Sequence, residues 1–196
     1  MKAFSGSEEA FTGLEAAIVL IAFVVVAAVF SYVVLGAGFF TTQKSQQVVH
    51  SGVQAASSNI EILGDVYGRG SGTSSIVGIN FTIGLAAGGT PVDMQRITLV
   101  MANSSSRYEL TQFVPATGMT GGTPQAGFWT VVGVYNGDQS TMLETGEQAD
   151  ISVALPATNY IVKNDVFNLE IQPDVGAALG IKRKGPSAID AFQRLY

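Results

Sequence analysis

One carboxylate interrupts a long apolar run near the start of the chain. Glu15 is the only charged residue among residues 10–43, and it stands at the beginning of the apolar stretch Leu14–Leu35. A carboxylate near a helix N-terminus is favoured by the macrodipole and by unpaired backbone N–H groups. In an apolar bundle, however, an unpartnered carboxylate is costly. Glu15 therefore either lies at a lipid interface or pairs with a cation brought by another subunit.

Two polar motifs have the pattern of a covalent modification site. Asn80-Phe-Thr82 and Asn103-Ser-Ser105 fit N-x-[ST], the acceptor for N-linked glycans in exported chains. Asn80 is expected on an outward strand face and Asn103 in a polar turn, so both would be within reach of a glycan-transferring enzyme. Because such triplets also occur by chance, they indicate glycosylation only if the chain is exported.

The remaining reactive residues are too isolated to form a catalytic or metal site. His50 is the only histidine and cysteine is absent, so an imidazole cluster, a Ser-His-Asp triad or a thiolate site is hard to build. No calcium-binding D-x-D-x-D-G loop and no P-loop is present. The aspartates considered as turn residues stand singly, at Asp93, Asp138, Asp150, Asp165 and Asp174. The sequence predicts a protein that is not an enzyme, without cofactor or metal.

The composition indicates a chain of two parts. Of 196 residues, 47% are apolar and only 13% are charged, below the roughly 25% charged content of soluble domains. Most of the apolar excess lies in residues 14–40, and the rest is rich in Gly, Ser and Thr. The net charge of -5 argues against a nucleic-acid partner. The only basic cluster, Lys182 to Lys184, is interpreted as a solvated turn.

The apolar stretch is long enough to cross a bilayer, and the helix is expected to continue beyond it. A span of about 30 Å needs about 20 residues at 1.5 Å per residue, which Leu14–Leu35 supplies. Apolar residues then recur at helical spacing, at Val49, Val53, Ala56, Ile60 and Leu63. A helix from Leu14 to Leu63 would measure about 75 Å, more than an anchor needs. The small residues of this segment permit close approach of neighbouring helices.

The N-terminal residues also carry a family resemblance. The stretch FTGLEAAIVLIAFVVVAAVFSYVVL, which begins at Phe11, strongly resembles the N-terminus of archaellins, the archaeal flagellins of the type IV pilin-like superfamily. The resemblance is specific over about residues 11–50. In this family a dedicated leader peptidase removes a short leader, and Glu is the fifth residue of the mature chain. Cleavage between Ala10 and Phe11 would make Glu15 that residue, whereas cleavage after Gly6 or Gly13 would not.

The resemblance implies how copies of the chain assemble. The new amino group of Phe11 would be a cation for Glu15 of a neighbouring copy. The helices would pack in the filament core through Glu15 and a stripe of apolar residues, namely Leu14, Ile18, Ile21, Val25, Val29 and Tyr32. By resemblance, a motor ATPase and a membrane platform would insert subunits from the membrane and rotate the finished filament.

The remainder of the chain is expected to form a β domain. Short apolar stretches alternate with turn residues and have no helices between them, which favours an antiparallel immunoglobulin-like sandwich. The candidate strands are residues 75–85, 96–102, 108–113, 128–135, 150–154, 166–172 and 179–183, and residues 69–75 are expected to be a loop. The alternation of Val77, Ile79, Phe81, Ile83 and Leu85 predicts one inward face.

Together these observations predict an α+β chain with a leader (1–10, cleaved), a long core helix (11–64) and an outer β-sandwich (65–196). The expected function is that of a structural subunit of an archaellum filament, a homo-oligomer of many copies outside the cell that serves swimming. Two alternatives remain open. One is a subunit of a non-rotating adhesive pilus, and the other is a monomeric surface protein anchored by one helix.

Overall fold

The chain consists of two units, Met1–Ser51 and Gly52–Tyr196. The computed structural model describes residues 6–115, 118, 120–138 and 140–196. Residues 1–5, the first half of the expected leader, lie outside the described residues.

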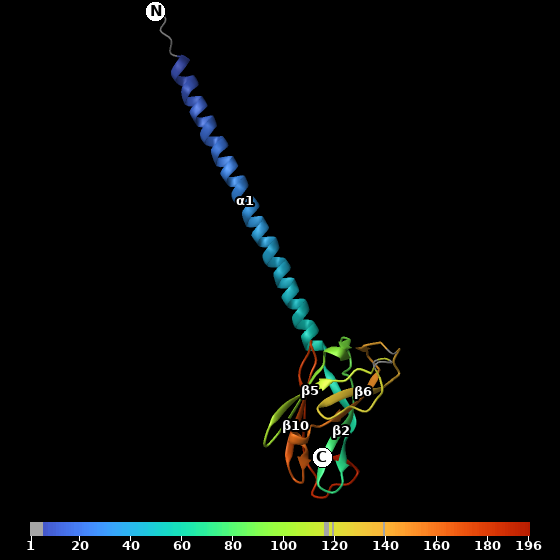
Figure 1. The fold of residues 1–196 in the computed structure, drawn as a ribbon. Coiled ribbons are helices and arrows are strands. Elements are labelled where there is room, and N and C mark those ends of the chain that lie inside the picture. Colours follow the sequence, from blue (N-terminus) through green and yellow to red (C-terminus); the bar gives the residue numbers. More distant parts are fainter. Residues whose placement is uncertain (1–5, 116–117, 119, 139) are drawn as a thin grey trace, which may run out of the picture. The chain divides into compact units, whose positions relative to one another are not determined.

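The described residues of the first unit form one helix, which ends at Ser57. Helix α1 (Gly6–Ser57) is uninterrupted over 52 residues (Figure 1). At 1.5 Å per residue it is about 78 Å long, so the expectation of a helix much longer than a bilayer is confirmed. Gly36 and Gly38 do not break it, although each lowers helix propensity by about 1 kcal/mol.

The helix ends at Ser57, before the predicted boundary at residue 64. The Ser58 backbone N–H donates the last helical bond to the carbonyl of Gln54 at 2.9 Å. Asn59 Nδ2 then donates to the carbonyl of Ala56 at 3.2 Å. Polar side chains of this kind compete with helical hydrogen bonding and favour helix ends. The predicted helical position of Ile60 and Leu63 is therefore wrong, because both belong to strand β1.

The second unit consists of short strands and two 3-10 turns. The strands are β1 (Ile60–Ser71), β2 (Ser75–Leu85), β3 (Val92–Asp93), β4 (Thr98–Asn103), β5 (Arg107–Gln112), β6 (Phe128–Tyr135), β7 (Met142–Leu143), β8 (Gln148–Ala154), β9 (Ile161–Val162), β10 (Val166–Gln172), β11 (Leu179–Lys184) and β12 (Phe192–Leu195). The 3-10 turns are η1 (Met94–Arg96) and η2 (Ala157–Asn159). The expected strands at 75–85, 128–135 and 166–172 have the observed bounds.

Ten of these strands form one sheet that folds back on itself. Their order is β11-β10-β4-β5-β6-β8-β2-β1-β12, with β9 paired to β2, while β3 and β7 form a separate pair. Neighbours are antiparallel except β5 and β6, which pair in parallel through Thr111 with Phe128 and Gln112 with Trp129. The Lys184 N–H also donates to the carbonyl of Tyr196 at 3.1 Å, which joins the end of β11 to the chain end after β12. This single bond links the two ends of the strand order at one point.

The two halves of the sheet enclose a single apolar core. One buried cluster contains Phe167, Leu169 and Ile181 from strands β10 and β11. It also contains Ile79 from β2 and Ile151 from β8. Side chains from two inner faces that interdigitate in one core are the arrangement of a β-sandwich. The predicted fold class, a long apolar helix followed by an antiparallel β-sandwich, is therefore confirmed, with the parallel β5–β6 pair as an addition.

The inward face of β2 differs from the predicted one at a single point. Ile79, Phe81, Ile83 and Leu85 are buried as expected, but Val77 is half-buried and Ile76 is buried instead. Strand β1 shifts register between Arg69 and Gly70 opposite this point, and a bulge reverses which side chains face the core. The loop expected at residues 69–75 is shorter, since β1 continues to Ser71.

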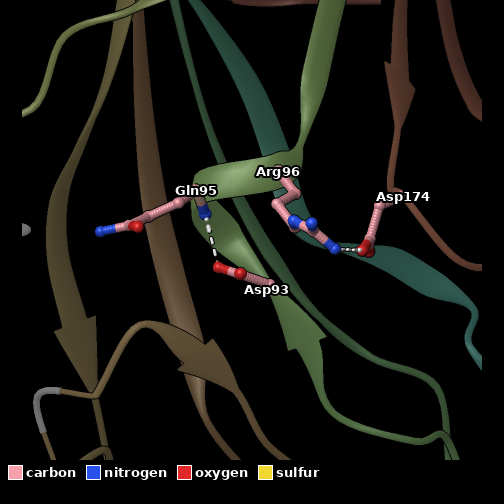
Figure 2. A network of polar contacts seen from close by, with 4 residues as sticks. All are labelled: Asp93, Gln95, Arg96 and Asp174. Carbon is pink, nitrogen blue, oxygen red and sulfur yellow. Dashed lines mark hydrogen bonds and ion pairs between the residues drawn. The ribbon is translucent and has the colours of Figure 1, made fainter.

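The single aspartates cap turns or pair on the surface, with one exception. Asp93 accepts from the Gln95 N–H at 3.0 Å at the start of η1, and Arg96 pairs with Asp174 at 3.0 Å (Figure 2). Asp138 accepts from the Ser140 N–H at 2.9 Å. The exception is Asp150, which lies within β8 rather than in a turn.

Candidate assembly surface

The candidate site is the surface of α1 from Leu14 to Phe40, which is apolar on all its sides. Nine consecutive residues from Ile18 to Val26 are apolar, and at 3.6 residues per turn they cover every direction around the helix. Every residue from Thr12 to Ala56 is exposed. This segment is long and apolar enough to cross a membrane by its length and composition. A helix apolar all round is stable only when lipid or other protein covers it.

The predicted stripe residues lie on this surface but do not define its limits. Their exposures are Leu14 60%, Ile18 59%, Ile21 61%, Val25 55%, Val29 60% and Tyr32 81%. Residues on other sides are as exposed, including Leu20 at 65%, Phe23 at 72% and Phe30 at 70%. The stripe prediction missed these residues, although the uninterrupted apolar run would have identified them.

Glu15 is the one charged residue on this part of the surface. It lines a shallow hollow on the helix together with Ala16, Val19, Leu20 and Phe23. Within the described residues, Glu15 has no ion pair and no side-chain hydrogen bond. Its carboxylate lies beside apolar side chains. A lipid or protein that covers this surface must therefore either leave the carboxylate hydrated or supply a cation.

The expected leader cleavage point also falls within α1. Ala10 and Phe11 both belong to the helix, and the bond between them is one turn before Glu15. The side chains of residues 6–11 lie outside the described residues. The helix places the backbone nitrogen of Phe11 and the Cα of Glu15 about 6 Å apart along its axis, at 1.5 Å per residue.

The helix also contains small residues that have no role within one subunit. A Cβ added to Gly36 or Gly38 would meet nothing within 4 Å. After these glycines, the Thr41 hydroxyl donates to the Ala37 carbonyl at 2.8 Å and Thr42 does the same to Gly38 at 2.9 Å. Glycines that cost helix stability and relieve no contact inside the subunit fit a surface on which another backbone comes close.

The two glycosylation motifs lie in different settings in the β unit. Asn103 ends β4 and its Oδ1 accepts from the N–H groups of Ser105 and Ser106 at 3.0 and 2.8 Å, which closes the turn to β5. Asn80 lies within β2, and its Oδ1 accepts from Ser152 Oγ at 3.1 Å. Both Oδ1 atoms are thus occupied, and neither Nδ2, the atom that bonds to a glycan, donates to another described residue.

The described residues contain no cluster of potential metal ligands. His50 is exposed on α1. Among residues 6–115, 118, 120–138 and 140–196, no three His, Asp or Glu side chains converge on a point that could hold a metal ion. The basic residues Lys182 to Lys184 belong to β11 rather than to a turn. Positive charge along such an outer strand discourages edge-to-edge pairing.

Three known proteins are similar to this chain, two of them over nearly all of its length and one over a short segment. The chain is 41% identical over 198 residues to "Probable flagellin 1" of Archaeoglobus fulgidus, covering 98% of this chain and 97% of that protein. It is also 91% identical to the 24 kDa flagellin of Methanospirillum hungatei over 32 residues. These residues make up 16% of this chain and 100% of the compared flagellin sequence. The archaeal flagellum structure of Methanospirillum hungatei strain JF1 matches with a TM-score of 0.72 and 32% identity, covering 93% of this chain and 98% of that chain.

The family match agrees with the architecture derived from the residues. The family model described as archaeal-type flagellin matches residues 10–183, which include the exposed apolar helix and most of the β unit. The match therefore includes Glu15, strands β1 to β10 and all but the last residue of β11. The chain belongs to the archaeal-type flagellin family, a family of structural filament subunits.

Proposed function

We propose that many copies of this chain polymerise through the apolar surface of α1 into an extracellular filament that serves swimming. The observation that carries this proposal is that every residue from 12 to 56 is exposed and that 23 of the first 29 are apolar. A single subunit has no means of covering this surface. A bundle of copies buries it, and the β units then remain outside as the wall of the filament.

The subunit waits in the membrane before it assembles. Lipid covers the apolar surface of α1 as well as protein does, so the hydrophobic effect gives little preference between the two. The preference must come from close packing and from polar contacts that exist only in the bundle. Gly36 and Gly38 supply the close approach, and Glu15 supplies the polar contact.

Glu15 forms its contact with the amino group of Phe11 in a neighbouring copy. This amino group is created when a leader peptidase cuts between Ala10 and Phe11. A buried carboxylate and ammonium stabilise each other only as a pair, and removal of one partner from such a pair costs about 3–5 kcal/mol. Assembly is thereby restricted to processed subunits in the correct register.

Other proteins act on the chain before and after assembly. A motor ATPase and a polytopic membrane platform insert processed subunits at the filament base and rotate the filament. The support for these partners is membership of the archaeal-type flagellin family. After export, Asn80 and Asn103 carry N-linked glycans, because both stand in acceptor motifs and both Nδ2 atoms lack a donor contact within the described residues.

The charge of Glu15 provides the direct test. Glu15→Gln keeps the size of the side chain but removes its charge, and Glu15→Ala removes both. Both variants are expected in the membrane fraction, with filaments on the cells reduced at least about tenfold, since a loss of 1.4 kcal/mol is already tenfold. Glu109→Ala removes an exposed carboxylate from the β unit and should leave filaments unchanged. Normal filaments on Glu15→Ala cells would reject the proposed role.

Sheared filaments separate the proposed function from its alternatives. N-terminal sequencing is expected to give Phe-Thr-Gly-Leu-Glu, which tests export, cleavage and assembly together. Deletion of the chain should abolish swimming in soft agar. Filaments whose loss leaves swimming intact would identify an adhesive pilus, and the absence of any sheared filament would identify a monomeric anchored protein.

A further inference from the structure

A small hollow lies on the outer face of the sheet, where β1, β2, β8 and β12 are neighbours. Its volume is about 240 Å³, and its walls include the side chains of Asp65, Tyr67, Asn80, Thr82, Asp150 and Phe192. Pockets for drug-sized ligands usually measure about 300–1,000 Å³. The hollow is therefore suited to one small ring rather than to a large ligand.

One wall of the hollow is aromatic and partly exposed. The rings of Tyr67 and Phe192 stack with centroids 5.1 Å apart and an interplanar angle of 16°. Although stacked on each other, they remain 37% and 57% exposed. The ion pair of Asp65 and Arg194, at 3.0 Å, holds β12 against β1 beside them. The result is an aromatic plate of two stacked rings that remains partly exposed in the subunit.

The opposite wall is polar, and its hydrogen bonds leave one amide nitrogen available. Ser152 Oγ donates to Asn80 Oδ1, and Thr82 Oγ1 donates to Asp150 Oδ1 at 2.6 Å. Asn80 Oδ1 and Asp150 Oδ1 thus each accept a hydrogen bond from a neighbouring strand, while Asn80 Nδ2 donates to no described residue. The negative charge of Asp150 also raises the pKa of Tyr135 through Coulombic interaction and hydrogen bonding. A carboxylate has about four acceptor sites, so Asp150 can accept further hydrogen bonds next to the aromatic plate.

We propose that the hollow seats the first sugar ring of a glycan attached to Asn80 Nδ2, with the ring lying on the Tyr67–Phe192 plate. This inference rests on the proposed glycosylation of Asn80. Because Asn80 forms part of the wall, a ring bonded to its Nδ2 starts inside the hollow. The hydroxyl groups of the ring donate to the carboxylates of Asp65 and Asp150, which accept strong charge-assisted bonds.

The transfer requires a sugar donor of defined chemistry. A bond forms between Nδ2 and the anomeric carbon of the sugar, and the bond from that carbon to the phosphate of a glycosyl phospholipid breaks. The phosphate leaves with the electron pair of this bond, and the amide nitrogen loses one proton.

The position of Asn80 also determines when the transfer takes place. Asn80 is paired with Tyr67 on β1 and with Ser152 on β8, so its backbone is engaged on both sides. An enzyme that binds the motif as an extended free segment must act before these strands pair. The sugar then comes to lie against the outer face of the sheet as the strands pair. Asn103 lies in an exposed turn and has no such restriction.

The test separates attachment from seating in full-length subunits in detergent. Mass spectrometry of the peptides containing Asn80 and Asn103 measures attachment, and the rate of enzymatic deglycosylation measures protection. Wild-type Asn80 should be occupied, and its glycan should be removed about two- to tenfold more slowly than in Phe192→Ser, the factor that one stacking contact supplies. The control Val166→Ser, an exposed apolar residue on β10, should leave that rate unchanged.

Each outcome identifies which proposal fails. An unmodified Asn80 overturns both the glycosylation and the seat. An occupied Asn80 with equal rates in wild type and Phe192→Ser overturns the seat alone. A map of the wild-type filament by electron cryomicroscopy decides without any variant: sugar density over Tyr67 and Phe192 supports the seat, and a segment of a neighbouring subunit in the hollow overturns it.

Discussion

The helix and the β unit use the same apolar residue types for opposite purposes. Ile18 on α1 is 59% exposed, whereas Ile79 on β2 is completely buried. Phe23 on α1 is 72% exposed, and Phe167 on β10 is 1% exposed. In the β unit the apolar side chains stabilise the fold of one subunit. On the helix they contribute nothing to that fold and are available to other copies or to lipid.

This difference separates folding from assembly in one chain. The β unit buries its apolar residues in a core supplied by both halves of its sheet, so it can fold before it meets another subunit. The helix finds its partners only when copies come together. Substitutions of the same residue type in the two units should therefore affect two different measurements.

The largest expected effect compares two phenylalanines. Phe167→Ala should lower the free energy of unfolding of the β unit by about 3–5 kcal/mol, because it opens a cavity in a packed core. Phe23→Ala should leave that free energy unchanged and reduce filament yield instead. Urea unfolding of subunits in detergent, followed by the fluorescence of Trp129, measures the first quantity, since Trp129 is the only tryptophan and is 1% exposed.

The result that contradicts this separation is equally specific. If Phe23→Ala shifts the urea transition by as much as Phe167→Ala, the helix surface is not independent of the β unit. Electron microscopy of sheared material provides the filament count for both variants.

Two glycines give a second comparison with a smaller effect. Gly176 has a φ of +122°, and a Cβ there would collide with the backbone of Ser58, so Gly176→Ala should destabilise the β unit by about 1–3 kcal/mol. Gly36→Ala should stabilise the isolated helix by about 1 kcal/mol, because it improves helix propensity and meets no atom within 4 Å.

In the filament, Gly36→Ala should be destabilising, although the same substitution stabilises the isolated helix. A methyl group at Gly36 holds neighbouring backbones apart, so Gly36→Ala filaments should dissociate at a lower temperature than wild type, as light scattering on heating would show. Gly36→Ala filaments of unchanged thermal stability would show that no backbone approaches this point.

The elements predicted from the sequence were those with strong local patterns. The apolar run and the alternation within β2 depend on neighbouring residues, and both are present in the structure. Strand β1 was missed because the spacing of Ile60 and Leu63 also fits a helix, and the polar residues 57–59 decide between the two. The role of the helical stripe in assembly stays a prediction, and the apolar surface is wider than the stripe, since nine further apolar residues are exposed among residues 19–30.

Features that depend on distant parts of the chain could not be predicted. The parallel pairing of β5 with β6 and the bond from Lys184 to Tyr196 arise only when the sheet closes. The hollow beside Asn80 likewise needs Phe192, which β12 brings next to Tyr67 from the far end of the chain. The motif at Asn80 was visible in the sequence, but its surroundings were not.

The smallest expected effect compares an ion pair in each unit. Arg96 and Asp174 lie 3.0 Å apart with side-chain exposures of 68% and 29%, so Asp174→Asn should lower the free energy of unfolding by less than about 1 kcal/mol. At 1 M salt, where the Debye length is about 3 Å, this difference should disappear from the urea transition. Charges buried in a bundle are screened much less, so the filament defect of Glu15→Gln should persist at the same salt concentration. A Glu15→Gln defect that 1 M salt abolishes would place Glu15 in water, and the contrast between the two units would then not extend to their charges.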